Sequence, residues 1–341
     1  MAVSRGYSSY RGRSPKWKII LAVVLVLVIL AALGVMTMQK YIVYGEDGRP
    51  RLELPWQEPE TPPEDPGALD ITIEKTEKTP ELQILQVEEA PLADWTAREE
   101  ALALSPVHYS AVALTMKDSG GTVYFDAKTP DAPVKTAAAT AGALAELLAA
   151  DRPAIARLAC FRDSRTARSH VEEMGLKNTG GFIFYDGNSE NWLDPGKPAA
   201  RQYLCALAAE LAAMGFDEIL LTDVTYPTEG KLDKIDYGQT MKAQNLMTFL
   251  EEMRAALEPY GAALSVELPE AVVRDGSDNI AGLLLADVAP RVDRVYAVTT
   301  ADRVPALSAA VAAAGKDTDF VPEFPADSRE SAGGNFLHLA N

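Results

Sequence analysis

Three carboxylates stand at the ends of short, strand-like runs of the sequence. Asp223, Glu267 and Glu323 each close or directly follow such a run. Two converging carboxylates can cleave a glycosidic bond, with one as general acid toward the leaving oxygen and the other as nucleophile or base. For each residue taken alone, a carboxylate that caps a helix or faces water is the alternative. The three together favour acid–base chemistry on a sugar if the fold brings them to one place.

Eight strand-like runs alternate with helical patterns between residues 90 and 341. The predicted strands are 110–116, 154–160, 181–185, 218–222, 262–267, 294–298, 318–322 and 335–339, and the predicted helices are 136–150, 199–214, 238–259, 277–286 and 302–314. Alternation of this kind indicates an α/β fold with a parallel sheet, and eight units in about 250 residues are typical of a (β/α)8 TIM barrel. A doubly wound open sheet is the alternative, but no Gly-rich phosphate fingerprint follows the first predicted strand.

In a TIM barrel the active face lies at the carboxyl ends of the strands. We therefore expect Glu267 and Asp223 to act as acid/base and nucleophile, with Glu323 orienting the substrate. Further residues are predicted to contact the sugar or support the site: Lys117, Asp118, Arg162, Asp163, Trp192, Asp194 and Tyr226. Trp192 and Tyr226 can form an aromatic platform for a sugar ring, and core packing is the alternative for both. This chemistry requires no cofactor, and no Cys/His spacing predicts a metal site.

The N-terminus carries the pattern of a membrane anchor. Residues 19–36 form an uncharged apolar run that is long enough for one bilayer crossing. The basic tail 1–18 precedes this run. Five Lys and Arg residues without an acidic residue in that tail predict a cytoplasmic N-terminus and a C-terminal domain outside the cell membrane. A cleaved signal peptide is the alternative, but the apolar run is longer than a usual signal core.

Residues 37–89 are predicted to form an extracellular stalk, because Pro and Glu are dense from 50 to 66. Within it, the runs 41–44 and 51–54 can pair as a small hairpin. The formal charge is −17, and since the tail holds five uncompensated positive charges, the remainder stands at −22. Such a surface repels nucleic acid, and it disfavours an anionic polymer as ligand unless a local basic cleft exists.

Two cysteines, Cys160 and Cys205, are too few for a disulfide framework. Both lie in apolar surroundings, where a free cysteine behaves as a small hydrophobic residue. One bridge between them stays open as an alternative.

Several motifs resemble a glycoside-hydrolase-like TIM-barrel family of bacterial envelope proteins. The matching segments are GFDEI at 215–219 followed by Val224, Tyr226 and Pro227, KD at 117–118, RLACFRD at 157–163, WLDP at 192–195, VEL at 266–268 and GNFLHLAN at 334–341. They follow the family's order across residues 90–341. The resemblance implies the barrel fold and a site that acts on carbohydrate.

The chain departs from the family pattern at the fourth strand. Thr222 stands at the family's aspartate position, Asp223 at the following tyrosine position and Thr225 at the arginine position. A shift of one residue along a strand turns a side chain to the other face, unless a bulge at the strand end restores it. The late segment 293–300 also differs from the family's pattern.

The sequence thus predicts a membrane-anchored, extracellular, glycoside-hydrolase-like domain that acts on an envelope or environmental polysaccharide. A carbohydrate-binding or envelope scaffold module without hydrolysis is the first alternative. A domain that binds a protein partner of an envelope assembly is the second.

Overall fold

The computed structural model describes residues 42–44, 50–52, 81–87, 108–135, 138–150, 152–325 and 333–339. The chain divides into two compact units, Met1–Lys75 and Thr76–Asn341. In the first unit, β1 (Ile42–Tyr44) pairs antiparallel with β2 (Pro50–Leu52), which confirms the predicted hairpin. The predicted membrane span, 19–36, lies outside the described residues. Among those that are described, no helix has the length and apolar character needed to cross a bilayer.

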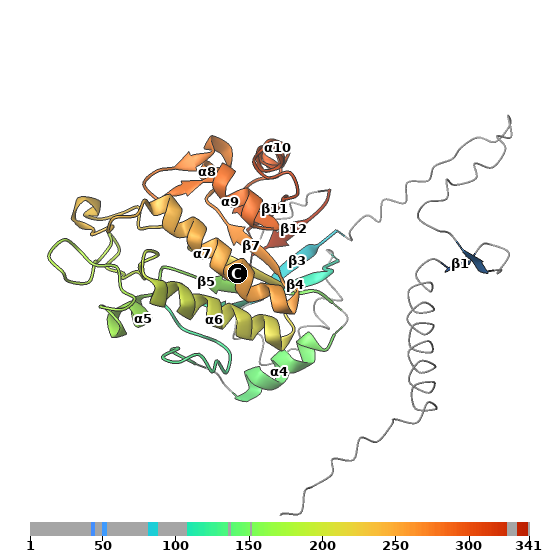
Figure 1. The fold of residues 1–341 in the computed structure, drawn as a ribbon, viewed down its shortest axis with the longest axis horizontal. Helices are drawn as coiled ribbons and strands as arrows, with labels where there is room; N and C mark the ends of the chain where they lie inside the picture. The colour runs from blue at the N-terminus through green and yellow to red at the C-terminus, as the bar shows by residue number, and fades with distance from the viewer. Residues whose placement is uncertain are drawn as a thin grey trace, which may run out of the picture. The chain divides into compact units, whose positions relative to one another are not determined.

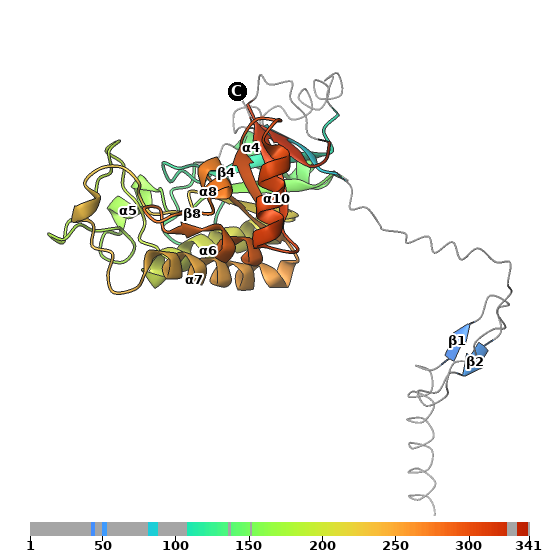
Figure 2. The same cartoon turned by 90° about the horizontal axis from the view of Figure 1, so that it is seen from above.

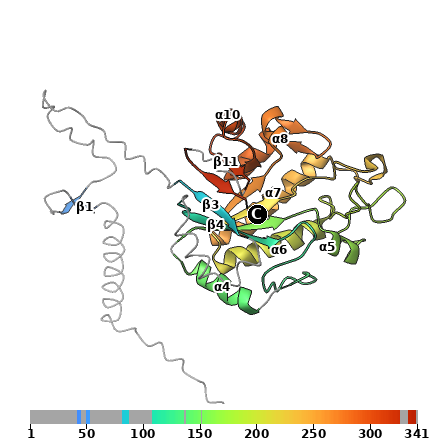
Figure 3. The ribbon, with the colours of Figure 1, turned by 180° about the vertical axis from the view of Figure 1, so that it is seen from behind.

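The second unit contains a closed barrel of eight parallel strands, as the sequence predicts (Figure 1). Around the barrel the strands are β3 (Gln83–Val87), β4 (Ala111–Lys117), β5 (Ala154–Ala159), β6 (Glu218–Thr222), β7 (Ala263–Glu267), β10 (Arg294–Val298), β11 (Asp319–Phe324) and β12 (Phe336–His338). Pairing of β12 with β3 closes the ring. Figure 3 shows β3 beside β4 in the barrel wall.

Two strand predictions are wrong, and their errors offset each other. The run 181–185 is part of a long loop with one isolated bridge, Lys177 to Ile183, and its Phe182 is 74% exposed. The first barrel strand is instead β3, which lies inside the segment predicted to be stalk, so the barrel begins before residue 90. Its apolar run is short and acidic residues follow it directly, which makes it resemble the stalk. As a result β6, β7 and β11 are still the fourth, fifth and seventh strands.

Four of the five predicted helices are confirmed: α4 (Ala138–Leu148), α6 (Pro198–Met214), α7 (Lys242–Leu257) and α10 (Val304–Ala314). Pro198 at its first turn and Gly215 at its end, with φ of 107°, set the bounds of α6. The prediction of a helix at 277–286 is wrong. That segment holds β8 (Ser277–Asp278), β9 (Leu283–Leu284) and the start of α9 (Leu285–Val288), and it follows the short α8 (Glu270–Asp275). Gly276 and Gly282 both adopt positive φ, which breaks the helical path.

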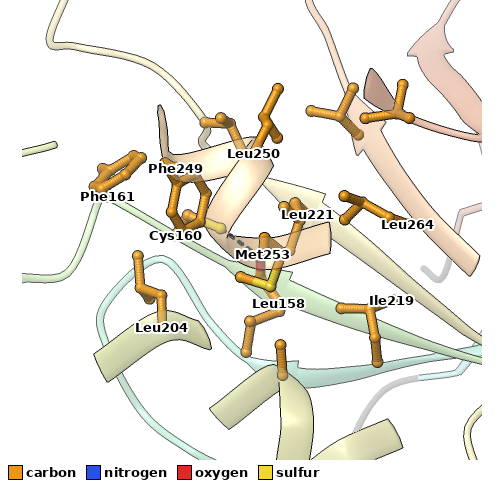
Figure 4. Close-up of a cluster of buried hydrophobic side chains, with 14 of the residues drawn as sticks. Leu158, Cys160, Phe161, Leu204, Ile219, Leu221, Phe249, Leu250, Met253 and Leu264 are labelled. Carbon is orange, nitrogen blue, oxygen red and sulfur yellow. Dashed lines mark hydrogen bonds between the residues drawn. The ribbon is translucent and has the colours of Figure 1, made fainter. Parts of the chain in front are cut away.

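The main hydrophobic core lies between the outer faces of β5, β6 and β7 and the helices α6 and α7. Figure 2 shows these two helices side by side. Leu158, Leu221 and Leu264 of the strands belong to one buried cluster with residues of the two helices. Among these, Figure 4 labels Leu204 of α6 and Phe249 of α7. Each is buried, and burying one such side chain contributes about 1.5–3 kcal/mol.

A second, smaller cluster fills the inside of the barrel. Its members are Leu82, Ile84, Ala111, Ala113, Ile155, Leu220, Tyr296, Val321 and Leu337. Because side chains alternate along a strand, Arg157 faces inward two residues after Ile155, and Glu323 faces inward two residues after Val321. The apolar interior thus ends in a charged layer at the carboxyl ends of the strands.

Candidate active site

The charged layer is organised by Arg157 on β5. Its Nη1 donates to Oε1 of Glu323 on β11 at 3.0 Å, and its Nη2 donates to Oε2 of Glu267 on β7 at 2.5 Å. The Arg157 side chain is only 11% exposed. One nearly buried cation therefore holds two carboxyl groups from β7 and β11, the two strands that flank β10.

Glu323 is fully buried beneath this guanidinium. Burial raises the pKa of its carboxyl to about 7, although the positive charge of Arg157 opposes the shift. Its Oε2 accepts or donates no hydrogen bond within the part of the chain that the structure describes. The expectation that Glu323 orients substrate needs correction, because a side chain with no exposed surface cannot contact a sugar. Its observed contact is with Arg157.

Glu267 reaches the solvent side of the same guanidinium, and its side chain is 26% exposed. Burial raises the pKa of Glu267, and the negative charge of Asp223 adds to the rise, while Arg157 works against it. A carboxyl that is accessible and holds its proton to higher pH than usual has the properties of a general acid.

Asp223 lies directly after β6 and is half-buried. Thr222 follows the inward register of Leu220, so a regular strand would turn Asp223 away from the barrel interior. Its backbone instead adopts φ of 52°, a left-handed conformation that Asp tolerates better than most residues. The Ser119 hydroxyl donates to its Oδ2 at 2.7 Å, and its charge acts on Glu267. The structure thus brings Asp223 and Glu267 to the same end of the barrel.

Lys117 and Asp163 form a buried ion pair. Lys117 Nζ lies 3.0 Å from Asp163 Oδ2, with neither side chain exposed, and it also donates to the Ala159 carbonyl at 2.8 Å. Asp163 caps α5 (Ser164–Ser169) by accepting from the Thr166 amide. For both residues the sequence leaves sugar contact and support of the site as alternatives, and their burial favours support.

Gly121 allows this arrangement. It adopts φ of 94°, and a Cβ on it would lie 1.9 Å from Oδ1 of Asp163. The loop after β4 can therefore approach the buried carboxylate only with a glycine at this position.

Asp118 and Asp194 stabilise turns. Asp118 accepts from the Tyr124 hydroxyl at 2.7 Å and from the Thr122 amide at 2.8 Å. Burial works to raise its pKa, but these hydrogen bonds outweigh burial and lower it. Asp194 accepts from the Gly196 amide, and burial raises its pKa.

The two predicted aromatic contacts lie in the core rather than on a platform. Tyr226 is fully buried and its hydroxyl accepts from Nδ2 of Asn245 at 2.9 Å. Trp192 is 7% exposed and its indole nitrogen donates to Asp186. Core packing, the alternative weighed for both, is the arrangement that the structure shows.

Arg162 remains accessible. Its Nε donates to Glu190, and both side chains are about one-third exposed, at 34% and 32%. The charge of Asp223 contributes to the raised pKa of Arg162, after the hydrogen bond to Glu190. Arg162 is therefore close enough to the carboxylates to serve a ligand bound there.

Arg157 and Ser119 belong to the site but are not among the predicted site residues, although Arg157 opens the RLACFRD motif at 157–163. A charge two residues after Ile155, inside an otherwise apolar strand, is a signal that could have identified Arg157. Ser119 carries no comparable signal, because its role depends on the loop after β4 reaching across β5 to the end of β6.

The described parts of the chain bear on the predictions for metal ligands and for the two cysteines. No group of three or more His, Cys, Asp or Glu side chains there could hold a metal ion. Cys160 and Cys205 are both free thiols, so the bridge left open by the sequence is not formed.

Comparison with known proteins identifies the family of this chain and agrees with its barrel fold. A family model described as "Putative glycosyl hydrolase domain" matches residues 93–299, more than half of the chain. The PgaB (BpsB) glycoside hydrolase domain from Bordetella bronchiseptica is 18% identical with a TM-score of 0.53, and the alignment covers 77% of this chain and 94% of that one. A hypothetical protein from Ruminiclostridium thermocellum ATCC 27405 is 21% identical with a TM-score of 0.46, covering 53% and 96%. No curated protein matches the sequence. At 18% identity, the similarity to the PgaB (BpsB) domain supports the fold alone.

Proposed function

The chain belongs to this glycosyl hydrolase domain family, and from that premise we propose that it is a membrane-anchored glycoside hydrolase acting on an envelope or environmental polysaccharide outside the cell. The barrel fold and the family support a domain that acts on carbohydrate. The observation that carries the catalytic proposal is the position of the two carboxylates: Asp223 directly follows β6, and Glu267 ends the neighbouring strand β7 at the same end of the barrel. The charge of Asp223 also contributes to the raised pKa of Glu267.

In the proposed mechanism Glu267 is the general acid. Its accessible carboxyl protonates the leaving glycosidic oxygen, while Asp223 acts as nucleophile or as base toward a water molecule. The hydrogen bond from Ser119 fixes the orientation of Asp223. Arg157 positions Glu267 from beneath, and Glu323 on the other side of the guanidinium holds Arg157 in place.

Carbohydrate binding without hydrolysis is the second candidate. One observation favours it: the inward-facing position at the end of β6 holds Thr222, which cannot act as an acid or base in the site. In that case Asp223 and Glu267 would bind sugar hydroxyl groups.

The test is release of reducing ends from a panel of polysaccharides and cell-wall preparations by the full chain in detergent. Wild type, Asp223→Asn and Glu267→Gln are compared. Hydrolysis by wild type that both variants lose supports the enzyme. Retention of wild type on one glycan, with no reducing ends released by any of the three proteins, supports the binding module instead.

The membrane anchor is proposed from the uncharged run 19–36 and the basic tail before it. Protease added to intact cells should digest the barrel and leave the tail protected. Protection of the barrel under the same conditions would reverse the proposed topology.

A further inference from the structure

A cavity of about 720 Å³ lies beside the proposed active site, between the loop after β4 and helix α5. We call it the Arg165 cavity; the lining residues that matter here are Gly120, Asp131, Ser164, Arg165, Arg168 and Ser169. Its volume falls within the range of roughly 300–1,000 Å³ that small-molecule sites occupy. Arg165, Arg168 and the hydroxyl of Ser164 give it hydrogen-bond donors.

The two arginines of this cavity differ from most others in the molecule. A carboxylate pairs with each of Arg157, Arg162, Arg201, Arg254, Arg274, Arg291, Arg294 and Arg303. Arg165 and Arg168 have no carboxylate within 4.0 Å among the residues that the structure describes. In a chain with a net charge of −17, two unpaired guanidinium groups in one hollow are unusual.

Arg168 is nevertheless held in position. Its Nε donates to the side-chain oxygen of Asn191, and its guanidinium carbon lies 5.7 Å from the centre of the Tyr185 ring. These contacts leave the two terminal nitrogens of Arg168 available. A guanidinium fixed in this way loses little freedom when it binds a ligand.

Arg165 connects the cavity with the proposed catalytic residues. Its backbone amide donates to the Gly120 carbonyl at 3.3 Å. Gly120 directly follows Ser119, whose hydroxyl binds Asp223. A glycan whose scissile bond lies at Asp223 and Glu267 can therefore place a neighbouring sugar unit over Gly120 and into the Arg165 cavity.

One acidic residue, Asp131, also lines the cavity. Its Oδ2 lies 3.7 Å from Nε2 of His170, so it has a partner of its own when that histidine is protonated. Two arginines against one aspartate leave a local positive charge, while the chain as a whole repels anions.

We propose that the Arg165 cavity is a subsite for an anionic group, a carboxylate or a phosphate, on a sugar unit next to the scissile bond. Guanidinium groups bind both anions through paired hydrogen bonds. The Ser164 hydroxyl accepts from the Asn191 amide and keeps its own proton as a further donor, whereas Ser169 donates to the Arg165 carbonyl. This inference rests on the proposed function, because it identifies the class of polysaccharide that the same site takes.

Binding of small probes to the full chain in detergent tests the subsite separately from hydrolysis. Ligand-observed NMR would compare glucuronate, glucose 6-phosphate and uncharged glucose, so that the carboxylate and the phosphate are examined in separate arms. We expect at least one anionic sugar to bind about tenfold more tightly than glucose, as expected for charge-assisted hydrogen bonds. Arg165→Gln should remove that preference, and Arg274→Gln, an exposed arginine on α8, should keep it.

Equal binding of all three sugars, no binding of any, or an anion preference that survives Arg165→Gln would overturn the subsite. The outcome is independent of catalysis. Anion binding by a protein that releases no reducing ends retains the subsite and rejects the hydrolase, whereas hydrolysis without an anion preference does the reverse.

Discussion

The Ser119 hydroxyl donates a hydrogen bond of 2.7 Å to Oδ2 of Asp223, which joins the loop after β4 to the end of β6 across the intervening strand β5. This contact holds a carboxylate whose backbone is in the left-handed region, at φ of 52°. Asp223, which stands one position after Thr222 at the altered end of β6, is therefore supported by a specific hydrogen bond.

Ser119→Ala is expected to lower kcat by about ten- to a hundredfold with little change in KM, because a hydrogen bond to a charged group contributes about 1.5–3 kcal/mol. Ser119 is a positioning residue, so Ser119→Thr, which keeps the hydroxyl, should restore most of the rate. Steady-state kinetics on the glycan found in the panel would measure both. A rate for Ser119→Ala equal to that of wild type would show that Asp223 needs no such support.

The carboxyl of Glu323 makes stability depend on pH. Its folded-state pKa of about 7 lies above the ordinary value of 4.5, so the folded state binds this proton more tightly than the unfolded state. The resulting stabilisation is complete below about pH 4.5 and is lost as the pH rises through about 7, and it amounts to about 3 kcal/mol. Glu323→Gln, which mimics the protonated form, lacks this dependence.

Urea unfolding of wild type and Glu323→Gln at pH 4.5 and pH 8.5 measures the effect. The two proteins should have similar stability at the lower pH, and the variant should be the more stable at the higher pH. The same difference in the free energy of unfolding at both pH values would mean that Glu323 does not titrate in this range.

Lys117→Met should destabilise the barrel by about 3–5 kcal/mol, because it leaves the charge of Asp163 buried without a partner. The double variant Lys117→Met/Asp163→Asn should recover most of this loss, since Asn can still cap α5 but carries no charge. Chemical unfolding of the two single variants and the double variant provides the comparison. If the double variant were as unstable as Lys117→Met, the ion pair would not be the reason for the cost.

The position of β3 predicts where the barrel can be cut. A fragment beginning at Thr76 keeps β3 between β12 and β4, whereas one beginning at Ala90 opens the ring at two pairings. The first fragment should unfold cooperatively in thermal denaturation followed by circular dichroism. The second should show no cooperative transition, and a sharp transition for it would mean that β3 is dispensable.

Much of the fold could be predicted because its signals are local. Each of these signals can be recognised within a short stretch of sequence. They are the periodic patterns of α6 and α7 and the apolar runs of β4, β5, β6, β7, β10 and β11. The failures have physical causes. Strand β3 is one short run next to acidic residues, and the run at 181–185 is apolar but lies in a loop where Phe182 and Tyr185 are exposed.

The site was harder to predict than the fold. Asp223, Glu267 and Glu323 were identified from their places at strand ends, and all three lie at the carboxyl end of the barrel. Their division of roles depends on depth, since Glu323 is buried and Glu267 is not, and a strand pattern does not give the depth of a side chain. The contact of Ser119 with Asp223 depends on the left-handed backbone conformation of Asp223. The sequence does not predict this conformation, because most aspartates do not adopt it.

The central claim is that Glu267 is the general acid, and its most direct test is the rate of reducing-end release by Glu267→Gln beside Glu270→Gln. Glu270 is a matched control three residues away, on α8, where it accepts from Thr299 and Arg303. Our account predicts that Glu267→Gln loses about 10²–10⁴-fold in rate, the usual contribution of general acid catalysis, while Glu270→Gln stays within about twofold of wild type. Equal rates for the two variants, with wild type active, would contradict the assignment and move the catalytic acid to another residue.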